Sequence, residues 1–379
     1  LFTVTPGKQY TLSSVAIQIE DNAPLVTPGL KKKTGLRVGD GAVSKAILDG
    51  EKSILAALQE EGYVWAGAKD RKITVDHATT LVAVEYILIA GPAARFGPVV
   101  VNGPESLDPA VVLREIPWKE GDLLRKSALE KARAQLTRRG LFSLVQVEPD
   151  PSARNQAVVP VVVTVTDRKH RTIALGLHYR SDEGPGAEVL WENRNMFDKG
   201  HRLTLQSQVS SIEQNASAQY ELPGFMREDQ TLTLHFKMAN ESPDAYESES
   251  LDTGIWLERR LSSQLTLGTG PDLRLSHVTE RFTEDTYFLL GLPVELNWDT
   301  RDDRLNPVAG GMLKIHSAPY VDLNNADTTF FKNEINYSAY HDFSDDKDLV
   351  LAARLRIGMT QGESLEDVPA DIRFYAGGG

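Results

Sequence analysis

From residue 169 onward, apolar and polar residues alternate along the chain in one segment after another. In "RTIALGLHY" (171–179), Ile173, Leu175, Leu177 and Tyr179 fall on one face and the residues between them on the other. A period of two is that of an extended strand. The pattern predicts about eleven strands, joined by short polar turns that favour antiparallel neighbours. They lie near 171–180, 185–193, 201–212, 215–223, 230–240, 250–260, 263–275, 285–298, 311–321, 329–341 and 347–360.

The length of these segments favours a membrane barrel over a soluble sandwich or jelly roll, which also alternates. Globular strands average about five or six residues, whereas a membrane-spanning strand needs about 9 to 11. The second face carries Gln, Ser, Thr, His, Asn and Gly, as a wet barrel interior does. Aromatic residues lie near strand ends, where an interfacial girdle would place them: Tyr179, Phe197, Tyr220, Phe225, Trp298, Tyr320 and Phe343. Residues 169–379 are therefore expected to form the N-terminal part of an antiparallel transmembrane β-barrel.

The predicted strands do not close this barrel. Bacterial single-chain barrels use an even number of strands, and an open edge in lipid leaves backbone groups without water to bond. We therefore expect further strands beyond Gly379. The ending "IRFYAGGG" (372–379) agrees, because a glycine run makes a better loop than a terminus, and we expect the chain to stop inside a functional loop.

Residues 1–168 have a different organisation, in which a strand, helical segments and two further strands occur twice. Helical periodicity in 39–63 ends at Gly62. In the second unit, Ser106 or Asp108 suits a helix N-cap before Pro109, and a longer helix ends at Gly140. We expect two α+β modules, residues 1–92 and 93–168, each a three-stranded sheet covered by two helices.

Composition excludes several classes of function. A net charge of −12 disfavours nucleic-acid binding. The absence of cysteine removes disulfides, thiolate zinc sites and thiol catalysis. The start lacks the pattern of a signal peptide, so the chain either is mature or begins within a longer protein. The dispersed histidines do not have metal-site spacing, and "HDFSDDKD" (341–348) suits a solvated turn better than calcium. Common catalytic motifs are also missing, so neither an enzyme nor a cofactor is expected.

The modules resemble POTRA (polypeptide-transport-associated) domains, most clearly over 96–149, which ends in "RRGLFSLVQVEP". The strand-rich half resembles the outer-membrane protein assembly factors, the superfamily of BamA, TamA and the two-partner secretion transporters. "ITVD" and "VAVEYILIAGPAARFGPVVVNG" are most similar to TamA-type proteins. The resemblance implies a Gram-negative outer membrane, POTRA modules in the periplasm, a barrel of about 16 strands, and 1–92 as the second of three modules.

Two segments take expected roles from this resemblance. "WDTRDDRLNPVAGG" (298–311) is similar to the family's D-x-R-D…P…G segment before a barrel strand. The charged residues of this segment either lie in a solvated turn or pair across the lumen. The residues concerned are Asp299, Arg301, Asp302, Pro307, Gly310 and Gly311. "RFYAGGG" is similar to the start of the sixth extracellular loop, which folds back into the lumen; its residues are Arg373, Phe374, Tyr375, Gly377, Gly378 and Gly379.

Strand edges are the other candidate sites. The first barrel strand would meet the last at a weak lateral seam that can template incoming strands; it comprises Thr172, Ile173, Ala174, Leu175, Gly176, Leu177, His178 and Tyr179. Each module also has an edge strand that either adds an extended peptide or is blunted by charge. These edges contain Lys72, Ile73, Thr74 and Val75 in the first module, and Leu144, Val145, Gln146 and Val147 in the second.

Together these features predict an outer-membrane insertase or translocation factor that assists the assembly or secretion of β-barrel and autotransporter proteins. The implied partners are the outer-membrane bilayer, unfolded clients and a TamB-like protein anchored in the inner membrane. The alternatives are a BamA-type core assembly factor, a two-partner secretion pore and a porin-like channel with accessory modules.

Overall fold

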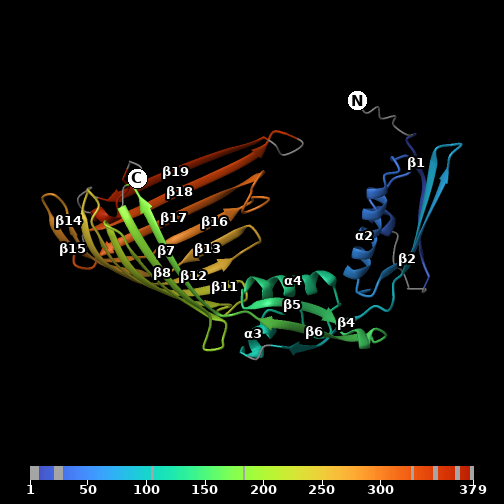
Figure 1. Ribbon diagram of the computed structural model, residues 1–379, viewed down its shortest axis with the longest axis horizontal. Coiled ribbons are helices and arrows are strands. Elements are labelled where there is room, and N and C mark those ends of the chain that lie inside the picture. The colour runs from blue at the N-terminus through green and yellow to red at the C-terminus, as the bar shows by residue number, and fades with distance from the viewer. Residues whose placement is uncertain are drawn as a thin grey trace. The chain divides into compact units, whose positions relative to one another are not determined.

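The structure is a computed structural model that describes residues 8–20, 29–103, 106–181, 184–325, 328–344, 349–362 and 368–375. The chain divides into two compact units, residues 1–168 and residues 169–379. Unit 1 contains two three-stranded sheets with their helices, and unit 2 contains one 13-stranded sheet (Figure 1). Each unit is described on its own below.

The first module of unit 1 is a mixed sheet with strand order β1-β3-β2, in which β1 runs parallel to β3 and β2 antiparallel to it. Helix α2 lies along one face of this sheet (Figure 1). Its residues Ile47, Ile54 and Leu58 are buried against the strands, as helical periodicity predicted. The elements are β1 (Thr11–Ile19), α1 (Leu30–Lys33), α2 (Ser44–Glu60), β2 (Gly67–Asp76) and β3 (Leu81–Ile89).

The second module repeats this arrangement with strand order β4-β6-β5. The Asp108 side chain accepts a hydrogen bond of 2.8 Å from the amide of Ala110, so Asp108, not Ser106, is the N-cap. The longer helix buries one face and ends before Gly140, where φ is +68°. The elements are β4 (Arg95–Asn102), α3 (Pro109–Leu113), α4 (Lys126–Arg138), β5 (Phe142–Pro149), the 3-10 turn η1 (Pro151–Ala153) and β6 (Val158–Asp167).

The two modules share hydrogen bonds at their junction. The Glu60 carboxylate, at the end of α2, accepts hydrogen bonds from the Ser127 amide (2.8 Å) and the Ser127 hydroxyl (2.6 Å), in the first turn of α4. Trp65 packs against the core of the second module, and the Arg154 guanidinium lies 5.8 Å from the centre of its ring. The first module therefore caps a helix of the second.

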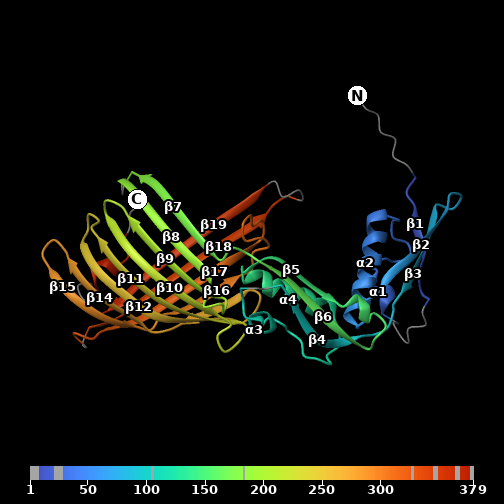
Figure 2. The ribbon, with the colours of Figure 1, turned by 60° about the horizontal axis from the view of Figure 1, so that its bottom comes forward.

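Unit 2 is a continuous antiparallel sheet that curves strongly about its inner face (Figure 2). Each strand pairs with the next along the chain from β7 to β12, as short turns predicted. These strands are β7 (Arg171–Arg180), β8 (Gly184–Met196), β9 (His201–Val209), β10 (Glu213–Pro223), β11 (Gln230–Glu241) and β12 (Glu247–Arg260).

Two of the eleven predicted strands are each broken in two. The break at Gly270–Pro271 separates β13 (Leu265–Thr269) from β14 (Asp272–Thr279), and the break at Leu292–Pro293 separates β15 (Glu284–Gly291) from β16 (Val294–Asp299). Proline has no N–H to give to a ladder, and a side chain on Gly270 would collide with the Ile255 carbonyl. The breaks face each other, because β13 pairs with β16 and β14 with β15. The remaining strands are β17 (Gly310–Asp322), β18 (Thr329–Asp342) and β19 (Val350–Gly362).

The alternation predicted from the sequence orders the two faces of this sheet. On β11, for example, Leu234, Phe236 and Met238 are exposed on the outer face. His235 and Lys237 point to the inner face, where His235 is hydrogen-bonded to Asp272 and Lys237 pairs with Glu213. The outer face is thus an apolar surface open to the surroundings, and the inner face is polar. This is the arrangement of a membrane barrel, not of two stacked layers with a dry middle.

Candidate functional site

The segment after β19 lies on the inner face of the curved sheet. Residues 368–375 include the 3-10 turn η2 (Ala370–Ile372) and the predicted loop-start residues Arg373, Phe374 and Tyr375. The predicted Gly377, Gly378 and Gly379 lie outside the described residues. Val368 and Ala370 are buried with Val278, Leu289 and Phe330 of the sheet in one apolar cluster. The backbone of this segment therefore rests on the wall of the sheet.

Asp371 holds this segment by charge. Its carboxylate accepts a bond of 2.6 Å from the Arg274 guanidinium of β14 and one of 2.8 Å from the Ser248 hydroxyl of β12. Arg274 donates in turn to Asp252, also at 2.6 Å. The Asp371 side chain is 0% exposed and that of Arg274 is 15% exposed, so both charges depend on this pairing.

Three further residues, Arg373, Phe374 and Tyr375, extend the attachment. The Arg373 guanidinium donates to both carboxylate oxygens of Glu280, at 3.0 and 3.1 Å, and to the Val368 carbonyl at 2.6 Å. Phe374 lies against Gly358 of β19, where any side chain would collide with its ring, and the Lys332 ammonium lies 4.9 Å from the ring centre. Tyr375 stacks on Tyr246 with ring centres 6.0 Å apart. We call residues 368–375 the interior segment.

The sequence pattern indicated only part of this site. It identified Arg373 to Tyr375 through family resemblance but missed Asp371 and its partners Arg274, Asp252 and Ser248. Those partners lie on strands about a hundred residues earlier in the chain; Arg274, for example, precedes Asp371 by 97 positions. No spacing between neighbouring residues in the sequence identifies them. A charged residue on the inner face of a predicted strand is the only signal, and many inner-face residues share it.

Ion pairs continue along the rest of the inner face. Arg202 of β9 lies between Glu192 of β8, at 3.6 Å, and Glu221 of β10, at 3.3 Å. Lys314 and Glu295 pair at 3.0 Å between β17 and β16. Charges at this density belong in water, because a charge on the lipid face would cost roughly 2–4 kcal/mol at the midplane.

The predicted charge motif forms an ordered turn between β16 and β17. The Arg301 guanidinium pairs with both oxygens of Asp299, at 2.8 and 2.9 Å, so the pairing is within the turn and not across the lumen. One Asp302 oxygen accepts from the amides of Val308 and Ala309, both at 3.0 Å. These amide bonds lower the pKa of Asp302.

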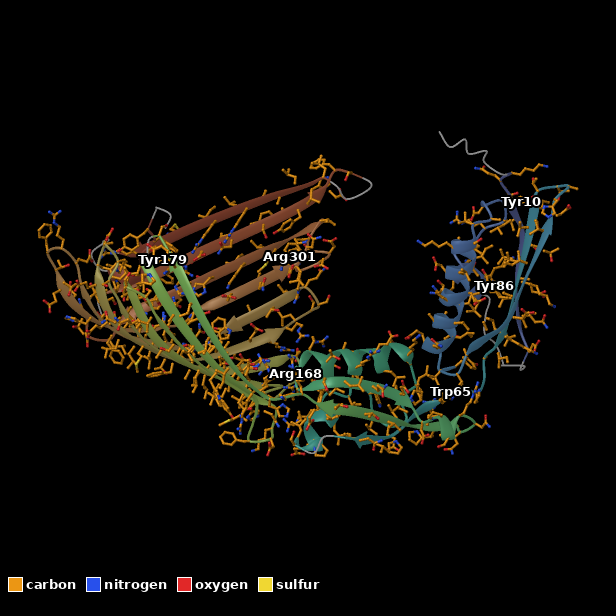
Figure 3. The ribbon with its side chains drawn as sticks, viewed as in Figure 1. Tyr10, Trp65, Tyr86, Arg168, Tyr179 and Arg301 are labelled. Atoms are coloured by element: carbon orange, nitrogen blue, oxygen red, sulfur yellow. The ribbon has the colours of Figure 1, made fainter. Side chains whose placement is uncertain are left out.

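Glycines and proline complete this turn. Pro307 directly precedes Val308, whose amide donates to Asp302. Gly310 has φ of +87°, and a side chain there would collide with the Thr300 carbonyl. Gly311 exchanges hydrogen bonds with Thr300, whose amide donates to the Gly311 carbonyl at 2.8 Å. Figure 3 shows that Arg301 and Tyr179 lie toward opposite ends of the strands of the 13-stranded sheet.

The predicted seam strand is β7, which pairs with β8 alone within the described residues. On its outer face Ile173, Leu175, Leu177 and Tyr179 are between 70% and 88% exposed. On the inner face the Glu188 side chain covers Gly176, and His178 covers Gly186, so that β7 interlocks with β8. At the opposite edge of the sheet, β19 pairs with β18 alone in the part of the chain that is described.

The predicted module edges are β2 and β5. Strand β2 carries Lys72, Ile73, Thr74 and Val75 and pairs with β3 alone, and both Ile73 and Val75 are exposed. Strand β5 carries Leu144, Val145, Gln146 and Val147 and pairs with β6 alone; Leu144 is exposed, whereas Val145 and Val147 are buried in the module core. These statements cover the described residues only.

Two negative findings hold for the described residues. No three His, Cys, Asp or Glu side chains gather as a metal site. No described helix combines the length and apolar character needed to span a membrane.

Family comparisons match both halves of the chain. The Omp85 superfamily domain matches residues 195–379, and the POTRA domain described as a surface antigen variable number repeat matches residues 94–168. The chain belongs to the Omp85 superfamily. Its fold, POTRA modules followed by an antiparallel β-barrel sheet, confirms the predicted fold class.

Individual relatives agree with this assignment. The outer membrane protein assembly factor BamA of Nitratidesulfovibrio vulgaris is 24% identical over 330 residues, covering 84% of this chain and 41% of that protein. A putative outer membrane protein assembly factor of Treponema pallidum is 21% identical over 259 residues, covering 67% of this chain and 30% of that protein. This Omp85 chain therefore spans less than half the length of these two relatives.

Solved structures show the same fold. BamA from Haemophilus ducreyi lacking POTRA domains 1–3 superposes with a TM-score of 0.77 at 17% identity, covering 97% of this chain and 74% of that one. CdiB from Escherichia coli gives a TM-score of 0.52 at 15% identity, covering 90% of this chain and 67% of that one. These structures show the fold.

The matches to the POTRA domain and to outer membrane protein assembly factors bear out the predicted location: the barrel lies in the outer membrane and the POTRA modules lie in the periplasm.

Proposed function

We propose that this Omp85 chain assists the assembly or secretion of outer-membrane β-barrel and autotransporter proteins by offering the edge of β7 to an incoming strand. The observation that carries the proposal is the state of β7. Its backbone pairs with β8 alone in the described part of the chain, and its outward side chains Ile173, Leu175, Leu177 and Tyr179 are exposed. An edge of this kind accepts a strand by main-chain hydrogen bonding.

The cost of an open edge in lipid gives this templating its driving force. Each unsatisfied N–H or C=O in hydrocarbon costs several kcal/mol. A client strand that pairs with β7 removes that cost for both partners and buries its own apolar face in the bilayer. The process then needs no nucleotide, and none of the described residues has to act as a catalyst.

The interior segment supports an assembly role over a porin-like one. Residues 368–375 occupy part of the lumen wall and are held there by the Asp371–Arg274 and Arg373–Glu280 pairs. An attached segment of this kind narrows the interior that a large, steadily open channel would leave clear. The contacts of the segment, on β12, β14, β15, β18 and β19, leave β7 and β8 unattached to it within the described residues, so the proposed seam strand stays separate from this anchored region.

The POTRA edges β2 and β5 are the proposed first contact with unfolded clients. Exposed Ile73, Val75 and Leu144 lie beside open backbone edges, so an extended client can pair with the strand and bury its own apolar side chains. Lys72 leaves β2 partly charged, which limits self-association of such edges.

The finer form of the proposal is a TamA-type factor that works with a TamB-like inner-membrane-anchored partner. It rests on the resemblance of residues 73–103 to TamA-type proteins. A BamA-type core assembly factor is the second candidate, and the names of the relatives from Nitratidesulfovibrio vulgaris and Treponema pallidum support it. Co-purification of the protein from native membranes separates the two, since the first predicts an inner-membrane-anchored partner and the second outer-membrane lipoproteins.

Site-specific photocrosslinking tests the central proposal. A crosslinker at Leu177, on β7 at the proposed seam, is expected to capture client strands during insertion. A matched crosslinker at Leu234, which faces outward from the middle of the sheet on β11, should capture lipid only. Equal client capture at both positions, or none at Leu177 while clients insert at the normal rate, would refute templating at β7.

A further inference from the structure

A glycine on the inner face of the barrel lets side chains from the strands on its two sides meet. Gly254 of β12 pairs with His235 of β11 and with Asp272 of β14. A Cβ atom on Gly254 would lie 2.6 Å from the His235 ring and 2.8 Å from the Asp272 carboxylate. The two side chains are hydrogen-bonded to each other at 2.8 Å. Residues two strands apart therefore form a direct polar contact over the strand between them, because that strand has no side chain at this point.

The seam strand β7 contains half of the same arrangement. Gly176 of β7 pairs with Glu188 of β8. The Glu188 side chain lies over this glycine, since a Cβ atom on Gly176 would be 2.5 Å from its Oε1 atom and 2.6 Å from its Cγ atom. Within the described residues β7 is the edge of the sheet, and β8 lies beside it (Figure 2). The Glu188 carboxylate thus lies over the backbone of the edge strand.

The Glu188 carboxylate has no cation beside it in the described part of the chain. Its side chain is exposed, and neither an ion pair nor a side-chain hydrogen bond engages it within those residues. By contrast, Glu192, further along β8, pairs with Arg194 and, at 3.6 Å, with Arg202. The residue of β9 that pairs with Glu188 is Gln208, which is uncharged. The carboxylate at the seam is therefore available to a cation from outside the sheet.

We propose that Glu188 selects client strands that carry a basic side chain facing the lumen opposite Gly176. This inference rests on the function proposed above, in which a strand adds to the edge of β7. Directly paired residues on neighbouring strands have Cβ atoms about 4.5–5.5 Å apart, so a lysine or arginine at that client position reaches the carboxylate over Gly176. The contact repeats the one between His235 and Asp272. An acidic side chain at the same position is repelled by Glu188.

Designed peptides measure this preference. The peptides have the length of one barrel strand, alternate apolar and polar residues, and differ only at one central polar position, which is arginine, glutamine or glutamate. The full-length protein in lipid nanodiscs carries a photocrosslinker at Leu177, and capture is titrated against peptide concentration. Because the pair is exposed to water, half-maximal capture of the arginine peptide is expected at a concentration about threefold below that of the glutamine peptide and about tenfold below that of the glutamate peptide.

Variants of the protein separate charge from shape. Glu188→Gln should remove the differences among the three peptides. Glu188→Arg should reverse their order, so that the glutamate peptide is captured best, which is a gain that misfolding cannot produce. Gly176→Ala places a methyl group where the carboxylate lies and should weaken the preference. Glu258→Gln removes an exposed inner-face carboxylate of β12, away from the seam, and as the matched control should keep the preference.

The outcomes distinguish this proposal from the templating on which it rests. Equal capture of the three peptides by the unaltered protein, or an order that Glu188→Arg leaves unchanged, would overturn selection by Glu188 while templating at β7 stood. If none of the peptides were captured at Leu177, both proposals would be overturned.

Discussion

Asp371 and Arg274 are 97 residues apart in the chain, yet their charged groups meet at 2.6 Å on the inner face of the barrel. Both side chains are largely removed from solvent, and Arg274 is shared with Asp252. The pair joins the segment after β19 to β14. It is therefore the contact on which the position of the interior segment most depends.

Asp371→Asn is expected to release the interior segment. Removing one partner of a buried ion pair leaves the other charge uncompensated, at a cost of about 3 kcal/mol. Hydrogen exchange should show loss of protection in residues 368–375, and single-channel conductance of the reconstituted protein should rise. Asp244→Asn, an exposed turn carboxylate, is the matched control and should change neither quantity. Unchanged protection in Asp371→Asn would show that apolar contacts alone hold the segment.

Glu60→Ala is expected to weaken the first turn of α4 in the neighbouring POTRA module. The Glu60 carboxylate accepts two hydrogen bonds from Ser127. The N-cap residue of α4 is Arg125, and its side chain makes no capping hydrogen bond. Loss of a cap costs about 1 kcal/mol. Hydrogen exchange of the amides in 126–129 measures it. Glu61→Ala removes the next carboxylate along the chain and should leave those amides unchanged. A similar loss in both variants would argue against capping between modules.

Tyr86→Phe is expected to destabilise the first POTRA module. The buried Tyr86 hydroxyl donates to the Ile47 carbonyl at 2.7 Å, between sheet and helix (Figure 3). Deleting a buried hydrogen-bonding group costs about 1 kcal/mol in the free energy of unfolding. Urea unfolding, followed by a spectroscopic signal from the first module, would detect this loss. Tyr10→Phe removes an exposed hydroxyl that contacts His77 at 2.7 Å and should have a smaller effect. Equal effects would mean that burial does not decide the cost.

The turn between β16 and β17 is expected to loosen in acid. Because amide bonds lower the folded-state pKa of Asp302, its ionised form adds stability that is present above the unfolded pKa of about 3.9. That stability is lost as pH falls through the lower folded pKa. Amide exchange at Val308 and Ala309 should therefore accelerate below about pH 4.

Two variants at this position separate charge from geometry. Asp302→Asn keeps an acceptor oxygen and should protect these amides without the acid transition. Asp302→Ala should expose them at every pH. An acid transition that persists in Asp302→Asn would assign it to another group.

Much of the fold was readable from local patterns, for physical reasons that the residues make plain. Alternation located the strands because a strand exposes its two faces to different surroundings, and Asp108, Gly62 and Gly140 marked helix ends through capping and backbone freedom. The strand breaks at Pro271 and Pro293 were not predicted, because the alternation of apolar and polar residues continues across both prolines. The prolines themselves were the available signal, since proline has no N–H to complete a ladder.

Long-range pairing was not readable in this way. Asp371 has no local feature that selects Arg274 among the inner-face charges, and the turn charges around Asp299 pair with each other although a lumen partner was equally consistent with the sequence. The capping of α4 by Glu60 likewise depends on how two modules meet. Such contacts follow from the three-dimensional course of the chain, which spacing along it does not encode.

Single-cysteine scanning of β11 tests the central claim most directly, and the chain contains no cysteine to interfere. Spin labels at 234 to 238 in the reconstituted protein report contact with oxygen, which concentrates in lipid, and with a water-soluble nickel chelate. Labels at Leu234, Phe236 and Met238 should respond to oxygen, and labels at His235 and Lys237 to nickel, with a period of two. If the apolar positions were shielded from both reagents, as in a dry core between two layers, the barrel account would be wrong.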